Sequence, residues 1–186
     1  MKLVLIRHGA VDYTPVNVRG FIGHGRDLAP LSEEGIHQAE RVAHAPELAG
    51  CQLILASPYT RAMQTAAIIS RGTGLDIHVE VDLHEWLPDK TYRYLNYSEL
   101  DALRVGYARA HGVCPPGTTC RWETVDEMNE RLKPVLDRWF YKGFQRLAVV
   151  CHGMVISRLT GIAQVEHCTP YVIDYDEHHR FHGFVT

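Results

Sequence analysis

The amino-acid sequence predicts a single α/β domain covering residues 1–186. Apolar, strand-like runs recur along the chain, and most of the intervals between them have the periodicity of amphipathic helices. This alternation is typical of α/β domains with a parallel sheet. A length of 186 residues suffices for one sizeable core and is short of the size at which cores usually divide. The expected strands are residues 2–6, 52–56, 76–81 and 146–151.

The first of these runs reads as a strand rather than a signal peptide. Residues 3–6 are apolar and partly β-branched, and Arg7-His8-Gly9 follows them instead of a small-residue cleavage site. The five cysteines are odd in number and irregularly spaced, which argues against a secreted disulfide framework. No apolar run approaches the roughly 20 residues of a membrane-spanning helix. We therefore expect a cytoplasmic protein that does not associate with a membrane.

One helix is expected before the second strand and another after it. Ser32 can cap the first helix, with Glu33 and Glu34 in its first turn, and Pro46 suggests where it ends. Ser57 occupies a capping position for the next helix and is followed by a proline. The buried stripes are expected to be Ile36, Ala39, Val42 and Ala43 in the first helix and Ala62, Ala66 and Ile69 in the second.

The chain between the third and fourth strands reads as a helical insertion of about residues 86–145. Residues 97–110 and 124–139 have helical patterns, and Pro134 could kink the second helix. Proline and glycine in residues 111–117 predict a loop between them that could border a substrate site.

The charge of the chain gives no general attraction to polyanions. The net charge is −3 with histidine neutral, and the lysines and arginines are scattered. Nucleic acid is therefore not an expected partner. An anionic substrate would have to be bound by a few converging cations.

Polar side chains follow the ends of all four expected strands. His8 comes after the first, Arg61 after the second, Glu85 after the third and His152 after the fourth. In open α/β sheets, ligands bind beyond the carboxyl ends of the strands, so parallel strands would bring these positions to one rim. The sequence predicts one pocket there.

These residue types suit the transfer of a phosphoryl group. Arg7 and Arg61 can hold its oxygens with guanidinium forks, and Arg61 also lies in the first turn of a helix. A neutral His8 can attack phosphorus while a protonated His152 neutralises charge on the transferring oxygens. Glu85 can protonate the leaving oxygen and then activate water.

Two glycines and two further carboxylates complete the list of candidates. Gly9 and Gly153 leave room for the backbone to approach a ligand closely. Glu80 and Asp82 are nearby alternatives to Glu85 as the acid.

Four ordered segments carry a family resemblance. They are Leu5–Gly9, Pro30–Ala39, Ser57–Ala66 and Val150–Gly153, which read LIRHG, PLSEEGIHQA, SPYTRAMQTA and VCHG. Together they resemble the signature segments of the histidine phosphatase superfamily, the phosphoglycerate mutase-like proteins. Four ordered matches make chance improbable, whereas Arg-His-Gly alone would be weak evidence.

The resemblance implies a three-layer α/β/α sandwich with a mainly parallel central sheet. It also implies a phosphohistidine at His8, a phosphate pocket that includes Arg7, Arg61 and His152, and neither a metal nor a cofactor. The sequence departs from the family where Ala10-Val11 replaces the usual Glu-Thr or Glu-Ser. An asparagine common in the family aligns with either Thr14 or Asn17, and both alternatives stay open.

Hydrolysis is preferred over a mutase reaction because the mutase pattern E-R-x-Y-G-x-x-x-G-x-x-K is absent. Residues 85–90 read EWLPDK instead. The chain also looks short for a mutase. We expect a histidine acid phosphatase-type phosphomonoesterase acting on a small-molecule phosphate ester. A cofactor-dependent phosphoglycerate mutase-type phosphotransferase and a non-catalytic phosphate- or phosphoprotein-binding module remain the alternatives, and the sequence allows a homodimer.

Further features allow both a functional and a structural interpretation. The aromatic residues of segment 86–97, with Lys90 and Arg93 between them, could bind a substrate ring or a second phosphate, or could simply pack as a half-buried loop. Two groups of His and Cys lack a recognised metal-ligand spacing, so surface histidines and packed thiols are preferred. These groups are His111, Cys114 and Cys120, and His167, Cys168, His178, His179 and His182.

Overall fold

A computed structural model describes residues 1–185. Its strands are β1 (Lys2–Arg7), β2 (Ile54–Ala56), β3 (Ile77–Val79), β4 (Arg146–Cys151) and β5 (Pro170–Asp174). Its α-helices are α1 (Thr14–Val18), α2 (Glu33–Val42), α3 (Thr60–Thr73), α4 (Tyr97–Arg109), α5 (Val125–Tyr141) and α6 (Gly153–Thr160). Short 3-10 helices cover Gly23–Leu28, Pro46–Leu48 and Val81–Leu83.

The strands form one mostly parallel sheet in the order β3-β2-β4-β1-β5. β1 lies parallel to β4, and β2 lies parallel to both β4 and β3. β5 pairs with β1 in the antiparallel direction at the edge of the sheet. The sequence predicted the four parallel strands but not β5.

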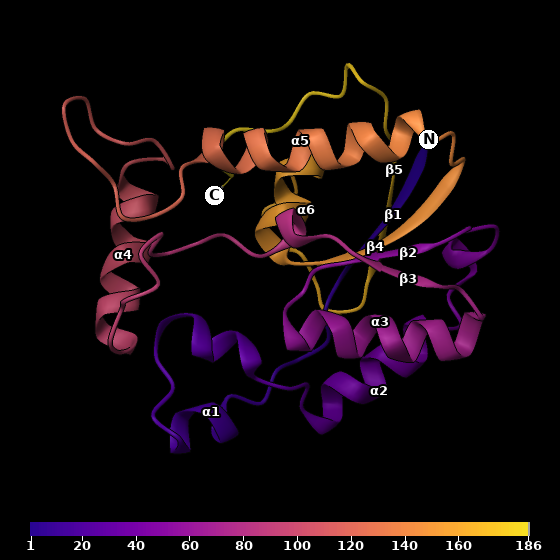
Figure 1. The fold of residues 1–186 in the computed structure, drawn as a ribbon, viewed down its shortest axis with the longest axis horizontal. Coiled ribbons are helices and arrows are strands. Elements are labelled where there is room, and N and C mark those ends of the chain that lie inside the picture. The colour runs from indigo at the N-terminus through magenta and orange to yellow at the C-terminus, as the bar shows by residue number, and fades with distance from the viewer. Residues whose placement is uncertain (186) are drawn as a thin grey trace.

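Helices cover both faces of the sheet, which makes the predicted three-layer sandwich (Figure 1). Side chains of a strand alternate between its two faces, and β1 shows the consequence. Leu3 and Leu5 belong to the core formed with α5 and α6. Val4 and Ile6 belong to the core formed with α2 and α3. The predicted α/β/α fold class is confirmed.

Local sequence signals account for the start of α2 but not of α3. Ser32 caps α2, because its hydroxyl accepts the N–H of Gly35 at 3.1 Å. Ile36 is 39% exposed, so its predicted place in the buried stripe is wrong. Ser57 does not cap α3, since that helix begins three residues later, at Thr60, with Tyr59 at the capping position.

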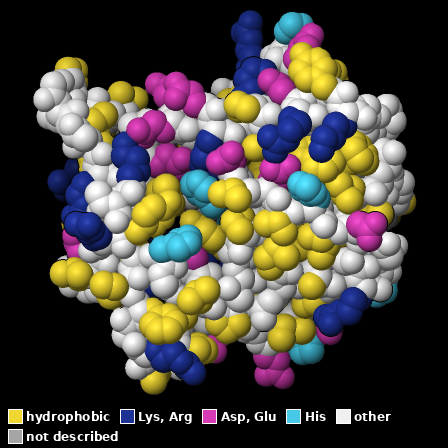
Figure 2. Space-filling model, in the orientation of Figure 1, with side chains coloured by type: hydrophobic (Ala, Val, Ile, Leu, Met, Phe, Trp, Pro, Cys, Tyr) yellow, Lys and Arg dark blue, Asp and Glu magenta, His cyan; other side chains and the backbone are white. Residues whose placement is uncertain are grey.

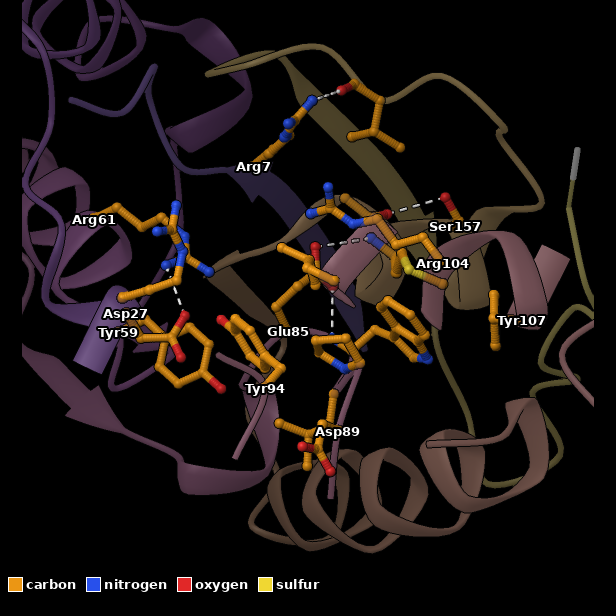
Figure 3. A pocket seen from close by; sticks show the side chains of 18 of the residues that line it. Arg7, Asp27, Tyr59, Arg61, Glu85, Asp89, Tyr94, Arg104, Tyr107 and Ser157 are labelled. Carbon is orange, nitrogen blue, oxygen red and sulfur yellow. Dashed lines mark hydrogen bonds and ion pairs between the residues drawn. The ribbon is translucent and has the colours of Figure 1, made fainter. Parts of the chain in front are cut away.

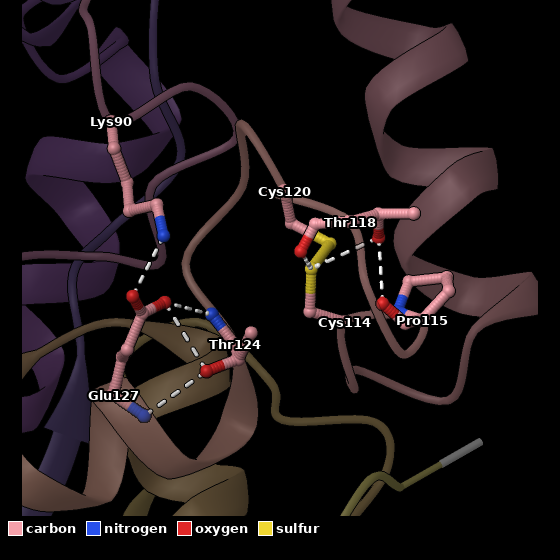
Figure 4. The surroundings of a disulfide bond; sticks show 7 residues. All are labelled: Lys90, Cys114, Pro115, Thr118, Cys120, Thr124 and Glu127. Carbon is pink, nitrogen blue, oxygen red and sulfur yellow. Dashed lines mark hydrogen bonds and ion pairs between the residues drawn. A yellow bond between two sulfur atoms is a disulfide. The ribbon is translucent and has the colours of Figure 1, made fainter.

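The chain between β3 and β4 contains α4 and α5, as predicted. Thr124 caps α5 and forms a capping box with Glu127, which also accepts a hydrogen bond from Lys90 (Figure 4). Pro134 lies inside α5, which runs through it to Tyr141.

A disulfide bond joins Cys114 to Cys120 in the loop between α4 and α5 (Figure 4). The expectation of packed thiols is therefore wrong for Cys114 and Cys120. The two cysteines lie six positions apart in a loop whose proline and glycine residues turn the chain back on itself, so their α-carbons approach to 5.6 Å. Cys51, Cys151 and Cys168 are free thiols.

On the face shown in Figure 2, basic side chains lie among acidic and hydrophobic ones instead of gathering in one patch. Within residues 1–185, no helix combines the length and the apolar character needed to cross a membrane.

Candidate active site

The register of two neighbouring strands brings the two motif histidines together. Arg7 at the end of β1 pairs with Cys151 at the end of β4, and the strands run parallel. His8 and His152 are the next residues of each strand, and the backbone N–H of His8 donates to the carbonyl of Cys151 at 3.1 Å. Their ring centroids lie 5.1 Å apart. Both side chains are buried at the carboxyl edge of the sheet.

The hydrogen bonds of His8 define its tautomer. Arg61 Nε lies 3.2 Å from His8 Nε2, and a guanidinium can only donate. Nε2 therefore carries the lone pair, and Nδ1 carries the proton that it donates to the carbonyl of Gly9 at 2.8 Å. Burial, followed by the charge of Arg61, holds the pKa of His8 well below its usual value. His8 is thus a neutral imidazole with its Nε2 lone pair directed at Arg61.

Arg61 reaches His8 from the first turn of α3. Its Nη1 lies 3.0 Å from a carboxylate oxygen of Asp27, so this cation is paired within the protein. The guanidinium also lies 4.8 Å from the centre of the Tyr59 ring. A phosphate that reached His8 would have to take over these guanidinium donors.

His152 differs from the charged role predicted for it. Its Nε2 lies 2.7 Å from the hydroxyl of Ser57, and its buried Nδ1 has no hydrogen-bond partner among the described residues. Burial, with the charge of Arg61 next, holds its pKa well below the usual value. His152 is therefore neutral, because burial and the neighbouring cation both disfavour its charged form.

Glu85 lies across the site from Arg61, in the segment that follows β3 (Figure 3). Its carboxylate oxygens accept the backbone N–H groups of Trp86 at 2.9 Å and of Met154 at 3.4 Å, the latter in the first turn of α6. Burial raises its pKa despite these hydrogen bonds and the charges of Arg61 and Arg7. This environment favours the protonated form of the carboxyl group.

A cavity of about 770 Å³ opens above these residues. Arg7, Arg61 and Glu85 line it (Figure 3), as does Gly153. The other predicted positions, His8, Gly9 and His152, are not among its lining residues. Arg7 donates to the carbonyl of Val165 at 2.7 Å. His8 is 5% exposed and contacts Arg61, which lines the cavity.

The two predicted glycines have different surroundings. At Gly153 the nearest atoms to an added Cβ belong to Arg7 at 3.7 Å or more, which is an ordinary contact distance. At Gly9 an added Cβ would stand 2.4 Å from the carbonyl oxygen of Gly35. The close approach of α2 therefore requires a glycine at position 9.

The alternative positions raised by the sequence lie away from the cavity. Glu80 is buried, and its oxygens accept hydrogen bonds from Arg138 at 2.6 Å and Trp139 at 2.5 Å. Its role is therefore structural, since it links the end of β3 to α5. Asp82 is exposed and does not line the cavity. Neither Thr14 nor Asn17 lines it, which leaves the family's asparagine without a counterpart there.

Sequence reasoning missed three residues that support the site. Asp27 pairs with Arg61, Tyr59 packs against both Arg61 and His152, and His167 Nδ1 contacts the carbonyl of His8 at 2.6 Å. Tyr59 could have been found from its place inside the Ser57–Ala66 motif. Asp27 and His167 come from irregular segments whose positions depend on tertiary folding.

The two groups of His and Cys do not assemble as ligand sets. No cluster of three or more His, Cys, Asp or Glu side chains within residues 1–185 has the geometry to hold a metal ion. Cys114 and Cys120 are bonded to each other.

The fold and the paired histidines have a counterpart among known families. The sequence model of the histidine phosphatase superfamily (branch 1) matches residues 3–170, and the chain belongs to this superfamily. The family resemblance predicted from the motifs is thereby confirmed.

Curated relatives include both mutases and phosphatases. A probable phosphoglycerate mutase GpmB of an Enterobacter species is 34% identical over 195 residues, covering 95% of this chain and 86% of the relative. The fructose-2,6-bisphosphatase TIGAR of Xenopus laevis is 29% identical over 126 residues, covering 68% of this chain and 45% of the relative. The names of these relatives indicate that the chain is an enzyme, but they do not decide whether it is a mutase or a phosphatase.

Solved structures share the fold. A mycobacterial glucosyl-3-phosphoglycerate phosphatase superposes with a TM-score of 0.73 at 22% identity, covering 100% of this chain and 98% of the other. A putative alpha-ribazole-5'-P phosphatase from Escherichia coli gives a TM-score of 0.70 at 22% identity, covering 100% and 96%. At these identities the likeness concerns the fold alone.

Proposed function

We propose that this protein hydrolyses a small-molecule phosphomonoester through a phosphohistidine at His8. The observation that carries the proposal is the state of His8: its Nδ1 is bonded to the Gly9 carbonyl, its Nε2 lone pair points at Arg61, and its pKa is lowered. Guanidinium groups bind phosphate oxygens, so a phosphate held by Arg61 would lie close to the Nε2 lone pair of His8, which is the nucleophile.

In the first step, His8 Nε2 attacks phosphorus and the bond from phosphorus to the ester oxygen breaks. Arg7 and Arg61 hold the phosphoryl oxygens. Glu85, whose protonated form burial favours, gives its proton to the departing oxygen. The dianionic group beside His152 would oppose the lowering of its pKa by burial.

In the second step, water attacks the phosphohistidine. Glu85, now ionised, accepts a proton from that water as the bond from phosphorus to Nε2 breaks. Inorganic phosphate leaves, and His8 returns to its neutral form. This cycle uses only side chains of the chain itself.

A mutase-type phosphotransferase is the second candidate, because relatives named as probable phosphoglycerate mutases cover most of the chain. It differs in that the phosphohistidine must pass its phosphoryl group to an organic acceptor before water arrives. We favour hydrolysis because the residues after Glu85 lack the mutase pattern.

A direct comparison separates these candidates. The protein is incubated with a broad panel of phosphomonoesters while inorganic phosphate is measured, with His8→Ala as the control. Phosphate release by the wild type alone supports hydrolysis. Interconversion of phosphoglycerates with negligible phosphate release would replace the hydrolase by the mutase, and binding of phosphate without either reaction would leave a binding module.

A further inference from the structure

The cavity is far larger than a phosphoryl group requires. Its volume of about 770 Å³ lies within the range of pockets that enclose most of a drug-sized ligand. In Figure 3, Arg61 and Asp27 lie on one side of Glu85, and Tyr107 lies on the other. The part of the cavity beyond Glu85, here called the distal part, is therefore the space available to the leaving group.

Aromatic rings form the distal wall directly beside the proposed acid. Trp86 follows Glu85 in the chain and donates its backbone N–H to that carboxylate at 2.9 Å. The Trp86 and Tyr107 rings both line the cavity and lie 4.6 Å apart, and Phe184 extends the wall at 5.4 Å from Tyr107. A leaving oxygen within reach of Glu85 would thus place its attached group against Trp86.

The polar atoms of this wall are either engaged or buried. Trp86 Nε1 donates to the carbonyl of Glu123 at 2.7 Å, and the Tyr107 hydroxyl, which has no hydrogen-bond partner among the described residues, is buried. On the Arg61 side of the cavity, the Tyr94 hydroxyl donates to the carbonyl of Gly23 at 3.0 Å. Asp89 is buried and accepts from Arg121. A polyhydroxylated leaving group such as a sugar needs free donors and acceptors, whereas the wall presents mainly ring surfaces.

The remaining arginines of the cavity are poorly placed for a second anionic group. Of the described residues, Arg26 and Arg104 are the arginines that line the cavity besides Arg7 and Arg61. Arg26 bonds Asn17 at 2.9 Å and also Tyr97, with its guanidinium 4.1 Å from the ring centre of that tyrosine. Arg104 is 60% exposed and lies 3.7 Å from the Asp101 carboxylate. Neither Arg26 nor Arg104 is placed like the buried Arg61, the residue proposed to bind the phosphoryl group.

We infer that the substrate is a phosphomonoester whose leaving group carries an aromatic ring, held against Trp86 and Tyr107. The inference rests on the proposed hydrolysis, because it assigns the leaving group of that reaction. Aromatic pairs prefer offset or edge contacts at centroid separations of about 4.5–7 Å, and a planar ring can make them with this wall.

The test compares esters of primary alcohols, so that the intrinsic reactivity of the leaving group is matched. Phenethyl phosphate should have a kcat/KM roughly tenfold or more above that of butyl phosphate and of a hexose phosphate. Trp86→Leu should abolish most of this preference, and Trp86→Phe should keep it. Because the readout is a ratio of two substrates, partial misfolding of a variant cancels.

A binding measurement keeps the two proposals apart. Titration calorimetry with phenylpropylphosphonate and propylphosphonate, which cannot be hydrolysed, should give roughly tenfold tighter binding of the aromatic ligand. Tighter binding without hydrolysis of any ester would overturn the hydrolase and retain the ring site. Equal phosphonate affinities with efficient hydrolysis of butyl or hexose phosphate would overturn the ring site and retain the hydrolase.

Discussion

Replacing Glu85 with Gln should slow the expulsion of an alkoxide far more than that of a nitrophenolate. An alkoxide is strongly basic and needs a proton as it leaves, whereas a nitrophenolate leaves without one. Glutamine matches the shape of Glu85 and can still accept a backbone N–H from Trp86 or Met154, the two donors that hold the carboxylate. It has no acidic proton to transfer.

The expected magnitude follows from the size of general acid catalysis. Loss of a positioned acid typically costs a factor of about 10²–10⁴, equivalent to about 3–5 kcal/mol in the barrier. We expect a loss of that size in kcat/KM for an alkyl phosphate and a loss of less than about tenfold for nitrophenyl phosphate. The ratio kcat/KM is the proper measure because it reports formation of the phosphohistidine, before the shared hydrolysis step.

The pH dependence provides a second reading of the same variant. The acid step needs protonated Glu85, so kcat/KM for the alkyl phosphate should fall as pH rises through the pKa of this group, which burial raises. Glu85→Gln should remove that limb of the profile. Equal losses for both leaving groups, or an unchanged limb, would refute the assignment of Glu85 as the acid.

Three further predictions concern the surrounding structure. Glu80→Ala should lower the free energy of unfolding by about 1–3 kcal/mol, because Trp139 loses a buried acceptor, while kcat/KM stays near wild type; a large kcat/KM loss would reinstate Glu80 as an acid. Gly35→Ala should destabilise the protein by about 3 kcal/mol in denaturant unfolding, because its Cβ would stand 2.0 Å from the Ala10 carbonyl oxygen. Thiol titration of the denatured, oxidised protein should find three of the five cysteines, and reduction should lower the free energy of unfolding by about 2 kcal/mol; five free thiols without reductant would rule out the Cys114–Cys120 bond.

The sequence predicted the central residues of the site because they sit on regular elements. Once β1 and β4 are parallel neighbours, His8 and His152 must lie side by side at their carboxyl ends. Arg61 follows in the first turn of α3, so its direction is set by the preceding strand and helix.

What the sequence could not predict depends on irregular backbone and on burial. Asp27 belongs to a 3-10 helix with no periodic pattern, and only folding of this segment over α3 brings it to Arg61. The Ser-Pro pair at Ser57 looks like a helix start, yet this hydroxyl contacts His152 instead. The neutral state of His152 comes from its complete burial beside the positively charged Arg61, which no local pattern encodes.

Trapping the covalent intermediate tests the central claim most directly. The protein is mixed with a substrate ester, quenched within milliseconds in alkaline denaturant, and mapped by peptide mass spectrometry, with His8→Ala as the control. We predict a phosphoryl group on His8 that survives base and is lost in acid, and none in the variant. Rapid turnover with no phosphoenzyme, or with phosphate on another residue, would contradict the assignment of His8 as the nucleophile.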